Sequence, residues 1–207
     1  MWRPVWVVID GSTDDSADGL CPGDDLQIIR SERNQGKGAA VRLAVLAAEA
    51  AGFSHVLTLD ADGQHCAADI PAMMALAAAH PRAMVLGTPI FGSEAPWVRV
   101  AGRRVSNFLA GLATGWAGIG DALYGMRVYP VAPLLRCFAE SRGMRGYDFD
   151  AEAAIRLCRM GVVAINLPTP VRYFATDAGG VSHFRYLRDN LALGRMFARL
   201  LLRSSRH

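Results

Sequence analysis

Short apolar runs that alternate with helical stretches are the feature that most constrains how this chain can fold. The runs are rich in Val, Ile and Leu and end abruptly in polar residues or glycine, which is typical of strands buried on both faces. They cover residues 5–9, 26–30, 56–59 and 83–87. Helical stretches follow the second and the third run, the latter at about 70–79, and this order implies right-handed crossovers and a parallel sheet. The sequence therefore predicts an α/β fold whose ligands bind at the carboxyl ends of the strands.

The second half of the chain continues with elements of both kinds. We expect a helix over residues 98–115, and then a turn from Asp121 into a strand that ends near Pro130. A further helix should close at Met160, and a strand should follow over residues 162–167. The α/β pattern thus extends over most of the sequence.

Length and composition limit the classes of protein to which the chain can belong. Its 207 residues suffice for one domain without disulfides, and a hydrophobic fraction of 52% fits a well-buried α/β protein. The net charge of +3 is too small to indicate nucleic acid. The sequence has no uninterrupted apolar run of about eighteen residues, and residues 1–4 lack secretory character. Scattered cysteines without metal-ligand spacing suit reduced thiols, so we expect a cytoplasmic protein; they are Cys21, Cys66, Cys137 and Cys158.

Two aspartates end the strand predicted at 56–59. Asp60 and Asp62, with Gln64 and His65 behind them, offer hard oxygen ligands and a spare imidazole to a divalent cation that also holds phosphate. The alternative is structural, because Asp60 could cap the next helix and Asp62 could make a turn. Polar groups elsewhere in the chain favour the metal site.

Two polar loops precede these aspartates. Asp10 opens the first loop, whose acids match EF-hand spacing, but a strand leads into it and Pro22 interrupts it, which argues against calcium. In the second loop, glycines on both sides of Lys37 let backbone N–H groups and an ammonium approach a phosphate. Its spacing is that of neither a P-loop nor a dinucleotide fingerprint. A solvated lysine at a helix entry is the structural alternative.

Polar residues of the second half suggest a second binding region. Arg103 and Arg104, near Ser106 on a predicted helix, could clamp a second phosphate or could simply be solvated. Asp121 is one of few acids in its stretch, which makes it a candidate. Asp150 is one of three acids within five residues at a helix start, where the helix dipole alone would also favour them.

Residues 182–207 have the pattern of a basic amphipathic helix, and we expect them to follow a domain that covers residues 1–181. At about 100° per residue, the arginines fall within an arc of about 80° and five large apolar residues within a separate arc of about 140°. The arginines are Arg185, Arg188, Arg195, Arg199, Arg203 and Arg206, and the apolar residues are Leu187, Leu193, Phe197, Leu200 and Leu201. The helix is either packed on the domain by its leucines or in contact with an anionic membrane surface.

Five motifs, taken together, resemble in order the landmarks of family-2 glycosyltransferases of the GT-A fold. They begin at Asp10, Asn34, Asp60, Asp121 and Phe149, and the resemblance runs from near residue 5 to about residue 190. Polyprenyl-phosphate sugar transferases, such as the dolichol-phosphate mannose synthases, look like one branch of this relationship. Residues 180–190 look closer to bacterial members from envelope-lipid and aryl-polyene gene clusters. The resemblance implies a Rossmann-like, mostly parallel sheet flanked by helices, with a C-terminal amphipathic helix.

The resemblance also implies how a donor would bind. Asp60, Asp62 and Gln64 would hold Mg²⁺ or Mn²⁺ on the diphosphate of a nucleotide-sugar, and the cation would neutralise the leaving nucleoside diphosphate. Asp10 would contact the nucleoside, and Lys37 would lie near the donor.

On the acceptor side the resemblance leaves two chemistries open. If the acceptor is a hydroxyl, for example of a glycolipid, Asp150 would take its proton in an inverting displacement, and Asp121 is the second catalytic candidate. If the acceptor is a polyprenyl phosphate, no base is needed, and Arg103 or Arg104 with Ser106 would position it. We expect peripheral contact with the cytoplasmic face of an anionic membrane. We expect no nucleic-acid partner.

The sequence departs from the family pattern in several places. Members begin with an additional strand and helix that carry a Pro-x-Tyr-Asn-Glu-like motif, whereas this sequence begins at what looks like the second strand, so we expect an N-terminal truncation. Ile9 stands where the first of two consecutive acids is usual. Thr88 and Pro89 replace a frequent Ser-Arg pair, and Asp177 stands where arginine is common. These last changes count against a polyprenyl-phosphate acceptor.

Two other functions fit parts of the sequence. Residues 59–62 mimic the nucleophile strand of a haloacid-dehalogenase phosphatase, but Gln64 stands where that motif has Thr or Val. The start of the sequence and its basic tail also fit a catalytically silent fragment or a membrane-associated partner.

Overall fold

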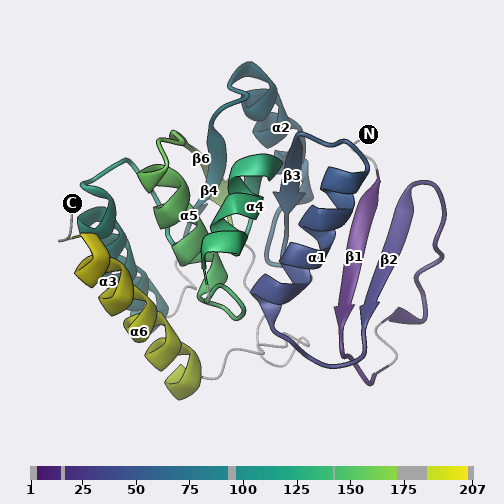
Figure 1. The fold of residues 1–207 in the computed structure, drawn as a ribbon, viewed down its shortest axis with the longest axis horizontal. Coiled ribbons are helices and arrows are strands. Elements are labelled where there is room, and N and C mark those ends of the chain that lie inside the picture. The colour runs from purple at the N-terminus through teal and green to yellow at the C-terminus, as the bar shows by residue number, and fades with distance from the viewer. Residues whose placement is uncertain (1–3, 15–16, 93–96, 142, 172–185, 205–207) are drawn as a thin grey trace.

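Figure 1 shows the computed structural model of the chain. The structure describes residues 4–204 apart from 15–16, 93–96, 142 and 172–185, and it describes the backbone but not the side chains at 98–99, 186–188 and 203–204. Helices and strands alternate along most of the chain, which confirms the predicted α/β class.

The strands of the described residues form two separate sheets. The first is a parallel pair, and the second has four strands in the order β3-β5-β4-β6. The pair consists of β1 (Val5–Asp10) and β2 (Leu26–Ser31), and the second sheet of β3 (His55–Thr58), β5 (Arg127–Pro130), β4 (Met84–Ile90) and β6 (Ala164–Pro170). The carboxyl ends of β1 and β3 deliver Asp10 and the Asp60 loop, as the sequence predicts.

One strand breaks the parallel pattern. β4 and β6 are parallel neighbours, but β5 lies between β3 and β4 and runs antiparallel to both. Arg127 at the start of β5 therefore faces Thr58 on one side and Leu86 on the other. The strand–helix–strand pattern did not reveal this insertion, because β5 comes from much later in the chain than the strands that it separates.

Helices cover the sheets on both sides and at one end. α1 contacts β1, β3 and α4, whereas α2 contacts β4 and β5. α3 packs against α5 and α6 at the end of the molecule opposite β1 and β2 (Figure 1). The helices are α1 (Lys37–Ala50), α2 (Ile70–Ala79), α3 (Trp97–Thr114), α4 (Val131–Glu140), α5 (Phe149–Arg159) and α6 (Tyr186–Ser204), and a short 3-10 turn covers Ala67–Asp69.

The start of α1 is fixed by a close backbone approach. Gly36, the residue before the helix, has a φ of 99°, in the left-handed region that favours glycine. A Cβ at this position would lie 2.5 Å from the carbonyl oxygen of Arg145. The carboxylate of Asp10 accepts hydrogen bonds from the backbone N–H groups of Gln35 and Gly36. These contacts hold Lys37, the first residue of α1, against the segment that leads into α5.

α6 packs its apolar face into the protein. Leu193, Phe197 and Leu200 are buried in one cluster with Ala110 of α3 and Ile155 of α5. This arrangement corresponds to the first alternative for the tail, a helix packed by its leucines. No helix in the described ranges is long and apolar enough to cross a membrane.

The basic arc of the tail is only partly described. Arg195 is exposed, and Arg199 forms an ion pair with the buried Glu152. Arg185 and Arg206 lie outside the described residues, as do the side chains of Leu187, Arg188 and Arg203 and the expected domain boundary at residue 181.

Candidate functional site

A lysine joins two carboxylates from distant parts of the chain. Nζ of Lys37, at the start of α1, lies 2.6 Å from Oδ1 of Asp60 after β3 and 2.6 Å from Oδ2 of Asp150 in α5. The Lys37 side chain is 16% exposed and that of Asp150 only 4%, whereas that of Asp60 is 31% exposed. The cluster is thus buried on the Asp150 side and open on the Asp60 side. It brings together three of the residues that the sequence singled out.

The charges of this cluster stabilise one another. Burial by itself lowers the pKa of Lys37, but the attraction of Asp150 and Asp60 outweighs it, so the pKa lies above its ordinary value. Burial raises the pKa of Asp60, but Lys37 and the nearby His65 outweigh it, so this pKa lies well below its ordinary value. Lys37 and Asp60 are therefore charged over the whole neutral range.

Several features around Asp60 suit a metal cation in addition to the Lys37 ammonium. A Cβ at Gly125 would lie 2.3 Å from Oδ2 of Asp60 and 2.9 Å from Nζ of Lys37, so the glycine leaves the room that the carboxylate and the ammonium occupy. Nε2 of His65 lies 3.5 Å from Oδ2 of Asp60, and neither ring nitrogen of this buried side chain has a hydrogen-bond partner. Oδ1 of Asp150 is also buried without a partner. Unpartnered acceptors around a carboxylate that already holds an ammonium suit a divalent metal ion.

Asp62 and Gln64 belong to an exposed turn. Oδ1 of Asp62 accepts a hydrogen bond from the backbone N–H of Gln64 at 3.0 Å, which is the turn that the structural alternative described. Within the described residues, no three His, Cys, Asp or Glu side chains are grouped so that they could hold a metal. A cation here would need oxygen ligands from a bound molecule as well, as expected for a metal that bridges protein and diphosphate.

Arg127 is the central cation of this region, and the sequence interpretation missed its role. Its guanidinium is fully buried and donates hydrogen bonds to the backbone carbonyls of Tyr124, Asp121 and Asp150 and to the Tyr129 hydroxyl. Burial raises the pKa of Tyr129 to about 12, so the hydroxyl stays neutral. Arg127 thus ties the backbone that carries Asp150 to the loop of Asp121. The motif Gly-Met-Arg, in which Arg127 stands, was the feature of the sequence that could have indicated this role.

Asp121 builds a loop together with Arg103. Oδ1 of Asp121 accepts hydrogen bonds from the backbone N–H groups of Leu123 and Tyr124 and lies 2.6 Å from Nη1 of Arg103. Asp121 is 2% exposed, so its oxygens are committed to the protein. The catalytic role expected of Asp121 stays a prediction.

The two arginines of α3 that were predicted to bind an acceptor lie in different environments. Arg103 is half-buried against Asp121, whereas Arg104 is exposed. Ser106 is buried in the same helix. The structure therefore brings Arg103 toward the loop and leaves Arg104 in solvent, and the acceptor role of all three residues remains an expectation.

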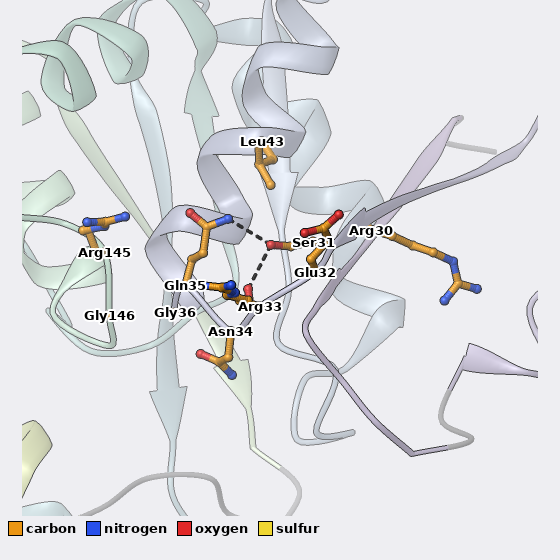
Figure 2. A pocket seen from close by; sticks show the side chains of 10 residues that line it. All are labelled: Arg30, Ser31, Glu32, Arg33, Asn34, Gln35, Gly36, Leu43, Arg145 and Gly146. Carbon is orange, nitrogen blue, oxygen red and sulfur yellow. Dashed lines mark hydrogen bonds between the residues drawn. The ribbon is translucent and has the colours of Figure 1, made fainter.

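Asp10 lies beside an open hollow rather than in the lysine cluster. A cavity of about 920 Å³ is lined by the end of β2, the start of α1 and the backbone near Arg145. Figure 2 shows Gln35 donating to Ser31 inside it, with Glu32 close by and Arg30 directed away. Both oxygens of Asp10 already accept backbone N–H groups at the rim of this hollow. Contact of Asp10 with a nucleoside stays a prediction.

Glu152 holds the helices behind the site together, which the sequence did not indicate. Its side chain is fully buried and forms ion pairs with Arg156 of its own helix and Arg199 of α6. It also accepts a hydrogen bond from the Ser141 hydroxyl at 2.7 Å. This network ties α6 to α5 two residues after Asp150.

Proteins of known family resemble this chain in sequence. The profile of the family described as Glycosyl transferase family 2 matches residues 4–138. Two undecaprenyl-phosphate 4-deoxy-4-formamido-L-arabinose transferases match over 149 residues, one from Sodalis glossinidius (strain morsitans) at 32% identity and one from Serratia proteamaculans (strain 568) at 30%. Each match covers 66% of this chain and 43% of the relative, so the chain spans less than half the length of these curated relatives.

Solved structures with the same fold come from glucosyl-3-phosphoglycerate synthase of Mycobacterium tuberculosis. The complex with Mn²⁺, uridine diphosphate and phosphoglyceric acid has a TM-score of 0.64 at 18% identity, over 96% of this chain and 66% of that chain. The complex with Mn²⁺ and uridine-diphosphate-glucose has a TM-score of 0.60 at 18% identity, over 94% of this chain and 65% of that chain. At this identity the similarity shows the fold alone.

Proposed function

The chain belongs to glycosyl transferase family 2, and from that premise we propose that it carries out metal-dependent, inverting glycosyl transfer from a nucleotide-sugar to a lipid-linked or other envelope acceptor. The observation that carries the proposal is the lysine cluster, in which Asp60 and Asp150 meet on one ammonium. In this proposal Asp60 is the donor-side carboxylate and Asp150 the acceptor-side one, and their shared contact with Lys37 would keep both near one bound sugar. Because the chain spans only 43% of its curated relatives, the activity of the whole protein is part of the proposal.

On the donor side, Asp60, Asp62 and Gln64 would hold Mg²⁺ or Mn²⁺. The metal supplies Lewis-acid stabilisation of charge on the leaving diphosphate. A Mycobacterium tuberculosis synthase of the same fold has been solved with Mn²⁺ and uridine-diphosphate-glucose, which supports a metal at the donor site and does not identify its ligands. Lys37 would neutralise a further phosphate charge, since its ammonium already lies 2.6 Å from Asp60. Asp10 would face the nucleoside from the rim of the hollow.

On the acceptor side, Asp150 would accept the proton of an attacking hydroxyl. Its Oδ2 is held by Lys37, whereas its Oδ1 is buried and has no hydrogen-bond partner in the protein, so this second oxygen could accept a proton from a hydroxyl that reaches it. A lipid phosphate would need no base and would instead use the arginines of α3. The names of the curated relatives favour an undecaprenyl-phosphate acceptor, and contact with an anionic membrane follows from such an acceptor.

Calorimetric titration with uridine and guanosine diphosphate, with and without MnCl₂, tests the donor site. We expect binding of at least one nucleotide that requires Mn²⁺, and a loss of about tenfold or more in affinity for Asp62→Asn. Asp24→Asn, at an exposed turn before β2, is the matched control and should bind as the wild type does. Absence of heat with either nucleotide would favour the catalytically silent alternative, and nucleotide binding by Asp62→Asn with wild-type affinity would remove Asp62 from the site.

A further inference from the structure

The imidazole of His65 is buried beside Asp60 and forms no hydrogen bond within the part of the chain that the structure describes. Its side chain is only 7% exposed, and both Nδ1 and Nε2 lack a hydrogen-bond partner. A polar group that leaves water without gaining a partner destabilises the folded state. An apolar side chain would therefore serve the fold better at this position, and the histidine needs another explanation.

The ring of His65 is held by a rigid wall. It meets the ring of Tyr124 edge to face at 4.6 Å, and Tyr124 is itself buried. The Tyr124 ring fills the space beside Gly87 so closely that a Cβ there would lie 2.7 Å from it. A neighbour packed this tightly cannot easily turn away. The position of the imidazole is thus fixed before any ligand binds.

The residue after Tyr124 places the carboxylate that the imidazole faces. Gly125 leaves the room that Oδ2 of Asp60 occupies, since a Cβ there would lie 2.3 Å from this oxygen. The Thr58 hydroxyl, at the end of β3, donates to the carbonyl of Gly125 at 3.1 Å. The strand that carries Asp60 is therefore tied to the same two residues, Tyr124 and Gly125, that hold His65.

The two oxygens of Asp60 face different nitrogen groups. Oδ1 lies 2.6 Å from Nζ of Lys37, whereas Oδ2 lies 3.5 Å from Nε2 of His65. The second distance is longer than an ordinary hydrogen bond, and a movement of about 0.5 Å would close it. An ionised carboxylate only accepts hydrogen bonds, so Nε2 has to carry the proton in such a contact. His65 can thus become a donor to Asp60 with little rearrangement.

Asp60 can hold a metal ion only by sharing or exchanging its contact with Lys37. Its side chain is 31% exposed, so it needs a second contact to keep its orientation when the ammonium moves away. We propose that His65 is a positioning residue and not a metal ligand: its Nε2–H donates to Oδ2 and holds the carboxylate in place while Asp60 binds the ion. This role rests on the proposed function, because it requires a metal at Asp60. Donors behind metal-binding side chains typically change metal affinity by about 10–100-fold.

The Mn²⁺ affinity of three variants tests this role. His65→Phe keeps a ring against Tyr124 but removes both nitrogens, and we expect Mn²⁺ to bind about 10–100-fold more weakly in the presence of uridine or guanosine diphosphate. His65→Gln retains an N–H donor and should restore the affinity to within about threefold of wild type. His80→Phe removes an exposed imidazole at the end of α2 and should bind as the wild type does. Electron paramagnetic resonance of free Mn²⁺ gives all four affinities.

Two further measurements separate positioning from packing and from ligation. The melting temperature of His65→Phe without metal should equal or exceed that of the wild type, because two buried nitrogens without partners are removed. Pulsed electron paramagnetic resonance of ¹⁵N-labelled wild type with Mn²⁺ should show no protein nitrogen bound directly to the ion. A residue that only fills space would lower the melting temperature when it is replaced.

Several results would overturn the proposal. Wild-type Mn²⁺ affinity in His65→Phe, or an equal loss in His65→Phe and His65→Gln, would show that the N–H donor does not matter. A protein nitrogen bound directly to Mn²⁺ would make His65 a ligand instead. Failure of the wild type to bind Mn²⁺ with either nucleotide would remove the donor site itself, whereas equal binding by wild type and both His65 variants would remove only the role of His65.

Discussion

Lys37 and Asp150 lie 113 positions apart in the sequence, yet Nζ of the lysine is 2.6 Å from Oδ2 of the aspartate. The same ammonium is equally close to Asp60, which we expect to bind the metal. Without a donor, the single positive charge of the lysine is therefore shared by two carboxylates, and the cluster keeps a net charge of −1. A divalent cation that binds Asp60 has to compete with the lysine.

This competition can be measured on Lys37→Met. Removal of the ammonium leaves the carboxylates uncompensated, so we expect Mn²⁺ to bind about tenfold more tightly in the absence of nucleotide. Nucleoside diphosphate in the presence of Mn²⁺ should bind more weakly, because a cation near the phosphates is lost. Electron paramagnetic resonance of free Mn²⁺ and calorimetry give the two affinities. Arg42→Met, which removes a cation from an exposed position of α1, serves as the control. Weaker Mn²⁺ binding by Lys37→Met would mean that the lysine only holds Asp60 in place.

Gly125→Ala should disturb the site without disturbing the fold. The added Cβ would overlap Oδ2 of Asp60, which is the end of a side chain that can turn away. We expect loss of Mn²⁺-dependent nucleotide binding, with a melting temperature within a few degrees of wild type. Gly194→Ala in α6, where a Cβ meets nothing within 4 Å, is the control. Unchanged nucleotide binding by Gly125→Ala would place the donor elsewhere.

The ion pairs of Glu152 should matter more to stability than those of exposed arginines. Glu152→Ala leaves Arg156 and Arg199 without their buried partner, and we expect a loss of about 3–5 kcal/mol in the free energy of unfolding. Arg195→Ala, on the same helix as Arg199 but exposed, should change it by about 0.5 kcal/mol or less. Urea denaturation followed by circular dichroism measures both. Equal losses would show that α6 is not held through Glu152.

The pH dependence of stability should identify the lysine cluster. The pKa of Lys37 is raised on folding, so its stabilising contribution is complete below the ordinary lysine value of about 10.4 and is lost as pH rises through the folded value. The pKa of Asp60 is lowered, so its contribution is complete above about 3.9 and is lost as pH falls through the folded value. The difference in melting temperature between wild type and Lys37→Met should therefore be constant between about pH 5 and 9 and should shrink at more alkaline pH. A difference that changes within this neutral window would contradict the assignment to Lys37.

Local patterns predicted most of the elements of this fold. The apolar run after Asp69 predicted α2 over the residues that the structure shows, and α3 begins and ends one residue before the prediction. α4 was missed, because Pro133 in its first turn looks like a break although proline is tolerated there. The strand that ends at Pro130 was predicted, but its antiparallel place between β3 and β4 was not, because pairing between distant strands leaves no local periodicity.

The site could be predicted as a set of residues but not as a geometry. Acids after apolar runs identified Asp60 and Asp150, yet only the fold shows that one lysine bridges them. The buried roles of Arg127 and Glu152 were not predicted, because a charged residue inside a short strand or at a helix start is usually assigned to the surface. The tail pattern could not distinguish packing from membrane contact, since a leucine face serves either, and Leu193 and Phe197 turned out to face the core.

The separation of β1 and β2 from the larger sheet bears on how the molecule opens. A two-stranded sheet is marginal by itself, and in the described residues this pair contacts the rest of the protein mainly through α1. Amide protons of β1 and β2 can then exchange with solvent through a partial opening that leaves β4 and β6 protected. Such an opening would withdraw Asp10 from Gln35 and Gly36 and loosen the start of α1. Occupation of the site at Lys37 would in turn slow amide exchange along both strands, at residues remote from Lys37 as well.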